Sequence, residues 1–285
     1  MHKDYYDELP FEQLNDVLAS IKIPVCPAIV TQAMAEAQKD FPNLVRLSQL
    51  ISGDVSTAAF TLKLANSSHF SRGEAISSIK QAIARLGTSN IVSMVVAAVL
   101  RSSTSFGLPA DFLESFWQRS SLVACAAALT ARHLQGVNPD TAYIYGLFHD
   151  AAVPVMMQRF DDYAAMLRGL KDDQSSLPDS EMGRYQCTHA QVGGLLAHNW
   201  HLPRSIVRAI RHHHDTELHR ADLKLLTDEE LGLISAVHLA EHLLSELLGE
   251  HEAETAGMFE VAVHYFGLHD EDLTDIREAL LPLTQ

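Results

Sequence analysis

Cysteine is scarce in this sequence and widely spaced. Only three of the 285 residues are cysteine, and no two of them form a C-x-x-C pair. A disulfide-stapled scaffold or a thiolate zinc site needs more cysteines at closer spacing. The cysteine content therefore argues against both and favours a reducing compartment, so we expect a cytoplasmic protein.

Glycine, proline and long apolar runs are also limited. The chain has 14 Gly and 10 Pro, and its longest apolar run, residues 91–100, is about half as long as a membrane-spanning helix. The N-terminal stretch is polar and acidic and lacks the charged-then-apolar pattern of a signal sequence. Because 47% of the residues are hydrophobic, the chain can still bury a core. We expect a soluble protein that contacts no membrane.

Positive charge is in short supply as well. The chain has 21 Lys and Arg against 36 Asp and Glu, a formal net charge of −15. Nucleic-acid binding depends on neutralising phosphates, which this balance disfavours. The stretch QAIARLGTSNIVSMVVA has the helix–glycine–helix form of a DNA-binding motif, but its second helix offers Val, Met, Ala and Leu where base contacts need polar side chains. We expect two packed core helices here and no nucleic-acid partner.

Helix signals, by contrast, run through almost the whole chain. We find no alternating strand pattern and no internal repeat. The residues that predict helix starts are Asp54, Ser78 with Gln81, Asn138 with Pro139, Thr188 and Pro203. Gly87 and Gly249 are natural helix ends. The polar stretch 170–183 reads as a surface connection. The pattern predicts an all-α fold.

Histidine is abundant, with 16 residues, and one of them is followed directly by aspartate at the end of an apolar stretch, as His149-Asp150. Adjacent residues cannot enclose an ion alone, so a metal site needs imidazoles and carboxylates from other helices. Contributors available along the chain are His189, the triplet 212–214 and Glu241. Two further histidine pairs, 198/201 and 238/242, have helical spacing but no evident third ligand, and we expect them to be solvated or locally bonded.

The chain resembles the HDOD proteins, a regulatory branch of the HD superfamily of metal-dependent phosphohydrolases. The stretches that carry the resemblance follow one another in the family's order: IKIPVCPAIVTQAM, LISGDVSTAAFTLKLANSSHF, ISSIKQAIARLGTSNIVSMVVAAVLR, FWQRSSLVACAAALTAR, YGLFHDAAVPVMMQRF, THAQVGGLLAHNWHLPRSIVRAIRHHH and SAVHLAEHL. The resemblance implies an N-terminal helical subdomain packed on an HD-like bundle. We expect an N-terminal segment at 1–19, these two subdomains at 20–105 and 106–250, and a helical extension at 251–285.

The sequence departs from the catalytic HD pattern in four places. Where active members have an early histidine ligand, this chain has Arg119 and Ser120, so that a cation is expected to occupy the space. The HD-GYP branch continues its His-Asp with Ile-Gly-Lys, whereas residues 151–153 are Ala-Ala-Val, without the lysine that stabilises phosphoryl charge. No Gly-Tyr-Pro follows the histidine triplet, and Glu241 stands where active members have Asp.

These departures favour a non-enzymatic signalling regulator or adaptor that acts through contact with partner proteins, and the length suggests a stand-alone HDOD domain. We expect no cofactor and only a vestigial metal site, made of His149, Asp150, His189, His213, His214 and Glu241. The alternative is a residual metal-dependent phosphohydrolase that holds a divalent ion and cleaves a cyclic dinucleotide or another phosphoester.

Overall fold

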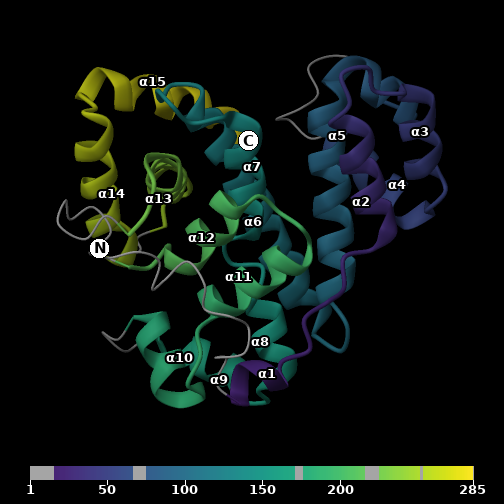
Figure 1. The fold of residues 1–285 in the computed structure, drawn as a ribbon. Helices are drawn as coiled ribbons and strands as arrows, with labels where there is room; N and C mark the ends of the chain where they lie inside the picture. The colour runs from purple at the N-terminus through teal and green to yellow at the C-terminus, as the bar shows by residue number, and fades with distance from the viewer. Residues whose placement is uncertain (1–15, 67–74, 171–175, 216–224, 251–252, 285) are drawn as a thin grey trace, which may run out of the picture.

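The computed structural model describes residues 16–66, 75–170, 176–215, 225–250 and 253–284, and it contains helices but no strand within them (Figure 1). The first helices are α1 (Asp16–Ser20), α2 (Ala28–Ala37), α3 (Leu44–Ser52), α4 (Val55–Ala65) and α5 (Ile79–Thr104). The central helices are α6 (Ala110–Ala131), α7 (Pro139–Phe148), α8 (Val153–Arg159), α9 (Tyr163–Gly169) and α10 (Leu177–Tyr185). The last are α11 (His189–Asn199), α12 (Arg204–His212), α13 (Asp228–Leu248), α14 (Ala253–Phe266) and α15 (Asp270–Leu280), followed by a 3-10 turn, Leu281–Leu283. The predicted all-α fold is confirmed.

Most helix starts lie where side-chain caps were predicted. The Asp54 carboxylate accepts a 2.6 Å hydrogen bond from the Thr57 backbone N–H at the start of α4. Asn138 caps α7 ahead of Pro139, and Thr188 forms a full capping box with Gln191 at the start of α11. These bonds satisfy backbone N–H groups that the helix itself leaves without partners.

Helices α2, α3 and α4 pack around the long α5, which separates them from the rest of the molecule in Figure 1. Gly87 has φ +82° and ψ 169°, so it breaks the helical conformation inside α5, as the predicted helix end requires. Residues 91–100 that follow are all buried, which confirms a pair of packed core helices at this motif. Buried residues on α2–α5 join those on α6, α7 and α11–α15 in one hydrophobic core.

The second part of the molecule comprises α1 and α6–α15. Helices α6 and α7 lie side by side at its centre, α13 packs against both and α12 against α7, and α11 packs on α12 (Figure 1). Gly146 on α7 lies so close to α6 that a Cβ there would be 3.2 Å from the Ala124 Cα. Helices α5 and α13 are long and apolar enough to cross a membrane, but 61% of the apolar window of each is buried inside the fold. Such burial is typical of core helices in a soluble protein.

The described part of the chain starts with α1 on the second part and then crosses to the first part, α2–α5. Leu18 of α1 and Ile21 join a second buried cluster with Val153, Met156 and other residues of α8–α11. The chain then runs without regular structure to α2, and on the way the Pro24 carbonyl accepts a 3.1 Å hydrogen bond from the Trp200 indole N–H. The expected boundary at residue 20 therefore falls at the end of α1, and residues beyond it still pack against the second part.

The prediction of a surface connection over 170–183 is wrong in its second half. Residues 171–175 lie outside the described part, but α10 begins at Leu177, with Ser176 accepting a hydrogen bond from the Asp179 N–H. The Ser176 cap and the early proline are start signals for a helix. The stretch is polar because α10 buries few of its residues, chiefly Glu181 and Tyr185.

Candidate metal centre

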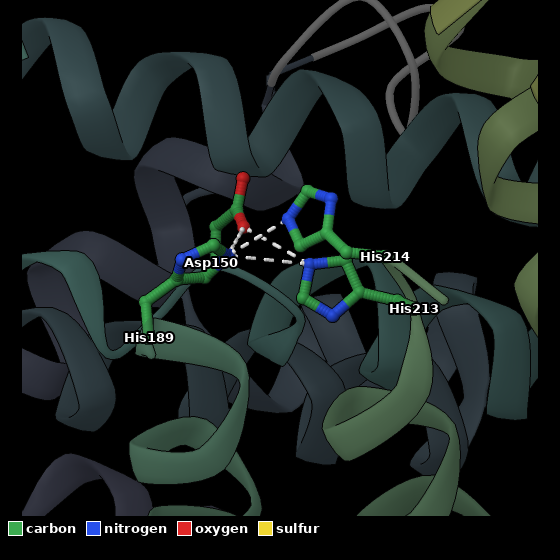
Figure 2. Close-up of side chains that lie close together, drawn as sticks. All are labelled: Asp150, His189, His213 and His214. Carbon is green, nitrogen blue, oxygen red and sulfur yellow. Dashed lines mark hydrogen bonds and ion pairs between the residues drawn. The ribbon is translucent and has the colours of Figure 1, made fainter. Parts of the chain in front are cut away.

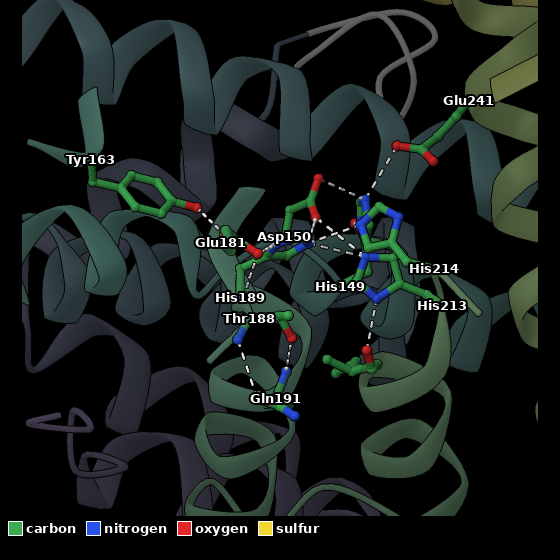
Figure 3. Close-up of polar contacts among 12 residues, drawn as sticks. His149, Asp150, Tyr163, Glu181, Thr188, His189, Gln191, His213, His214 and Glu241 are labelled. Atoms are coloured by element: carbon green, nitrogen blue, oxygen red, sulfur yellow. Dashed lines mark hydrogen bonds and ion pairs between the residues drawn. The ribbon is translucent and has the colours of Figure 1, made fainter. Parts of the chain in front are cut away.

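All six side chains expected in the vestigial site meet in one place (Figure 3), and Figure 2 shows four of them alone, Asp150, His189, His213 and His214. Four different segments bring them there: the end of α7 and the turn after it, the first residue of α11, the two residues after α12, and the middle of α13. The residues are, in that order, His149 and Asp150, His189, His213 and His214, and Glu241.

Asp150 lies at the centre of the group and uses its two carboxylate oxygens separately. Its Oδ2 lies 3.1 Å from His149 Nε2, and its Oδ1 lies 3.3 Å from His189 Nε2 and 3.5 Å from His213 Nε2. The Nε2 of His189 is in turn 3.0 Å from that of His214 and 3.4 Å from that of His213. On the other side, Glu241 Oε1 lies 3.2 Å from His149 Nε2.

Three of the imidazoles are held by their other nitrogen. His149 Nδ1 lies 2.8 Å from the Gly146 carbonyl, and His213 Nδ1 lies 2.7 Å from the Ile210 carbonyl. A carbonyl only accepts, so both Nδ1 atoms donate a proton. His189 Nδ1 is 2.8 Å from the Glu181 carboxylate. Anchors of this kind orient histidines toward a metal, because they direct the Nε2 lone pair into the centre.

The spacing of these atoms fits a cation. With metal–ligand bonds of about 2.1 Å, ligand atoms at right angles lie about 3.0 Å apart and those at tetrahedral angles about 3.4 Å apart. The separations around Asp150, His189, His213 and His214 range from 3.0 to 3.5 Å. One shared proton can bridge a single pair of Nε2 atoms, whereas three of them converge here. A divalent ion satisfies all of them together, so the donor set suits a metal.

Electrostatics couple the members of the centre. Burial alone lowers the pKa of His149, but the charges of Asp150 and Glu241 outweigh it and raise the pKa well above the usual value. The same opposition raises the pKa of His189 to about 10, with Asp150 and Glu181 opposing burial. Burial dominates at His213 and His214 and lowers the pKa of both. The centre therefore contains two imidazoles that favour a positive charge and two that favour neutrality.

The donors fall into two sets that share Asp150. One set is Asp150, His189, His213 and His214, and the other is His149, Asp150 and Glu241. The Asp150 side chain is 38% exposed, whereas the His189 side chain is fully buried, so the centre opens to solvent at the shared carboxylate. A carboxylate shared by two donor sets is suited to bridging two ions, and a four-donor set can hold one ion by itself.

We expected a cation, Arg119, to occupy the place of the early histidine ligand, and the structure does not place it there. Arg119 turns to the end of α13 instead, where its guanidinium donates to Ser245 Oγ at 2.7 Å and to Glu250 at 2.8 Å. Ser120 is buried and donates its hydroxyl to the Phe116 carbonyl. Val153, which stands where HD-GYP members have lysine, packs in the second hydrophobic cluster. None of these three side chains contributes to the centre.

The remaining histidines mostly lie outside. His212 points away and pairs with Asp215 at 2.7 Å, while His198 and His201 are exposed. His242 stacks on Phe259 with ring centroids 4.1 Å apart, as expected of a locally bonded residue. Its partner His238 is different, because its charge acts on the pKa of both His214 and Glu241. His238 therefore lies at the rim of the centre.

Sequence reasoning missed three residues next to the centre. Glu181 and Tyr163 form a buried chain that ends on His189 (Figure 3). The Tyr145 hydroxyl is buried without a hydrogen-bond partner among the described residues, and burial together with the charges of Glu241 and Asp150 raises its pKa. The helix signals at Ser176 and Pro178 point to α10, but no local signal shows that Glu181 is buried.

Comparison with known proteins agrees with this fold. An HDOD domain structure from Geobacter sulfurreducens is 21% identical to this chain and superposes with a TM-score of 0.67. The match covers 93% of this chain and 95% of that chain. A proposed phosphohydrolase from Shewanella amazonensis SB2B is 18% identical, with 94% of this chain and 97% of that chain covered and a TM-score of 0.68.

A longer relative is known by sequence. An uncharacterised protein of Treponema pallidum (strain Nichols) is 26% identical over an alignment of 239 residues, which covers 80% of this chain and 43% of that protein. The chain thus spans less than half the length of this relative. The HDOD domain itself matches residues 23–216, which carry five of the six residues of the centre. The chain belongs to the HDOD domain family.

Proposed function

We propose that this chain is a regulatory HDOD protein that holds a divalent metal ion in its centre and acts through contact with a partner protein, without hydrolysing phosphoesters. The observation that carries the metal is the convergence of three histidine Nε2 atoms and one carboxylate at separations of 3.0 to 3.5 Å. This revises our expectation from the sequence, which was a vestigial site without metal. Imidazole with carboxylate suits Zn²⁺, Mn²⁺ or Fe²⁺.

The charges around the centre support a non-catalytic role. Phosphoryl transfer needs positive charge placed against the developing negative charge of the phosphate. The charges that act most strongly on the pKa values of His149, Asp150 and Glu241 come from histidines and carboxylates, with no Lys or Arg among them in the described part of the chain. A phosphoester would therefore meet Asp150 and Glu241 with imidazoles beside them, and without a Lys or Arg among these groups to offset the carboxylates.

A second candidate function, metal-dependent phosphoester hydrolysis, is favoured by one observation. Asp150 directs one oxygen to each of the two donor sets, which is the arrangement that a pair of ions needs. Two ions would supply positive charge that the side chains lack. This candidate requires two metals per chain and turnover, whereas the first requires one metal and no turnover.

The two candidates are separated by metal analysis and a phosphodiesterase assay on the same protein, purified without chelators. We expect about one metal ion per chain and no cleavage of a cyclic dinucleotide or of bis(p-nitrophenyl) phosphate. Two ions with cleavage that is lost in Asp150→Asn would establish the hydrolase. Absence of bound metal, with none taken up on adding Zn²⁺, Mn²⁺ or Fe²⁺, would contradict both.

Variants in the histidine triplet provide a matched control. His214→Ala removes an Nε2 atom from the centre, whereas His212→Ala removes a histidine two residues away that pairs with Asp215 outside it. We expect the first variant to lose metal and the second to retain it. Equal metal content in the two variants would place the ion elsewhere.

A further inference from the structure

Glu181 is a fully buried carboxylate on α10, a helix that contributes no donor to the centre. Three hydrogen-bond donors converge on it: the backbone N–H and Nδ1 of His189, at 3.0 and 2.8 Å, and the Tyr163 hydroxyl (Figure 3). Tyr163 is fully buried as well. These partners of the Glu181 carboxylate thus lie in the protein interior, and one of them, His189, belongs to the centre.

The partners of Glu181 differ from those of Glu36, another buried glutamate. Glu36 accepts from Lys39 Nζ at 2.7 Å and lies 3.5 Å from Arg46, so that two flexible cations at the surface neutralise it. Glu181 has an imidazole and a phenol instead, both held inside the fold. A buried carboxylate is costly unless it is well paired, and pairing with a rigid aromatic ring fixes the orientation of that ring.

The orientation of the His189 ring matters because its other nitrogen faces the centre. His189 is the first residue of α11, where the capping box of Thr188 and Gln191 fixes the backbone. Glu181 accepts from the His189 backbone N–H and from its ring at the same oxygen, so main chain and side chain are held together. The opposite ring nitrogen then lies 3.3 Å from Asp150 and 3.0 Å from His214 Nε2.

We propose that Glu181 is a positioning residue for the metal, which holds His189 with Nδ1 protonated and Nε2 directed at the ion, while the Tyr163 hydroxyl fixes Glu181 in turn. This inference rests on the proposed metal-binding function. A carboxylate behind a ligating histidine raises the basicity of the ligand and sets its direction, and loss of such a partner typically weakens metal binding about 10- to 100-fold.

The test uses the full chain with the variants Glu181→Gln and Tyr163→Phe, and with Glu36→Gln as the matched control. Zn²⁺ affinity is measured by isothermal titration calorimetry. The His189 Nδ1–H proton is followed by NMR in the metal-free protein with ¹⁵N-labelled histidine. We expect Glu181→Gln to weaken Zn²⁺ binding about 10- to 100-fold and to shift the Nδ1–H signal upfield, because a neutral amide is a weaker acceptor.

Tyr163→Phe keeps the carboxylate and removes only one of its donors, so we expect a loss of affinity below about tenfold and a shifted but persistent Nδ1–H signal. The Tyr163→Phe variant also tests the proposal by itself if the Glu181→Gln variant does not fold. Glu36→Gln is expected to change neither measurement. Wild-type affinity and an unchanged signal in Glu181→Gln, or in Tyr163→Phe if that variant alone folds, would overturn the proposal.

Failure of the proposed function gives a different result. In that case the wild-type chain takes up no Zn²⁺, and the NMR signal of the metal-free protein alone decides the role of Glu181. If the Nδ1–H signal changes in Glu181→Gln, Glu181 orients His189. If the signal does not change, Glu181 has no such role.

Discussion

Glu36 in the first part and the carboxylates of the centre in the second part are neutralised by different means. On α2, the Glu36 carboxylate is paired with Lys39 and Arg46, which reach it from the surface. In the second part, Asp150 and Glu241 face imidazoles, and the Nε2 atoms of those imidazoles also face one another. The charge of Glu36 is balanced within the chain, whereas the centre has the geometry of the proposed metal site. Under the proposed function, the first part is a packing unit and the second a binding unit, and the two share one hydrophobic core.

The largest contrast is expected from Asp150→Ala. Because Asp150 belongs to both donor sets, its removal should weaken metal binding more than about 100-fold. Asp215→Ala removes a nearby carboxylate that pairs with His212 outside the centre, and it should leave metal affinity unchanged. Calorimetric titration with Zn²⁺ measures both. Similar affinities for the two variants would remove the distinction between the centre and its surroundings.

Leu47→Ala tests the first part as a packing unit. Leu47 is fully buried on α3, so the truncation should lower the free energy of unfolding by about 2–5 kcal/mol. Metal content of the folded variant should equal that of the wild type, because the side chain has no role in the centre. Urea unfolding and metal analysis check the two statements. Loss of metal in proportion to the loss of stability would show that the two parts do not act separately.

Gly193→Ala tests the packing that supports the centre. A Cβ at this position would lie 2.9 Å from Ile210 Cγ2 and 3.5 Å from the His149 carbonyl. Since the Ile210 carbonyl anchors His213, we expect a loss of about 1–3 kcal/mol in stability together with weaker metal binding. Gly257→Ala on α14 meets no atom within 4 Å and should stabilise the protein by about 0.5–1 kcal/mol with unchanged affinity. Thermal unfolding with and without Zn²⁺ distinguishes the two.

The smallest effect is expected at the start of α4. Hydrogen bonds from Thr57 lower the pKa of the capping Asp54, so its contribution is present above the ordinary aspartate range. Asp54→Ala should therefore cost about 1 kcal/mol at pH 7. The difference between wild type and variant should shrink as the pH falls through the lowered pKa. Denaturant titrations at pH 7 and near pH 3 measure it, and a difference that grows toward low pH would contradict the cap.

Local signals explain which elements sequence analysis predicts well. Asp54, Asn138 and Thr188 act within three residues of themselves, so the sequence contains the whole interaction. Helix α10 was missed because it buries few apolar side chains and therefore lacks the periodic pattern of a core helix. The crossing of the chain from α1 to α2 was also not foreseen, since it depends on contacts such as the one between Trp200 and Pro24, 176 residues apart.

The features of the centre also divide into those that the sequence predicts and those that depend on distant contacts. The family pattern led to the six donors, and the structure brings them together. The pattern did not reveal how Asp150 divides its oxygens, that Arg119 turns to Ser245, or that Glu181 stands behind His189. Each of these depends on the relative placement of helices that are distant in sequence. The absent lysine is visible in the sequence, whereas the convergence of nitrogen atoms is visible only in three dimensions.

The most direct test of a metal in this centre is an anomalous difference map from crystals of the chain purified without chelators. We predict a peak within bonding distance of Asp150 and of the Nε2 atoms of His189, His213 and His214. A map without a peak there, in crystals soaked with Zn²⁺ whose histidine rings keep the orientations seen here, would contradict it.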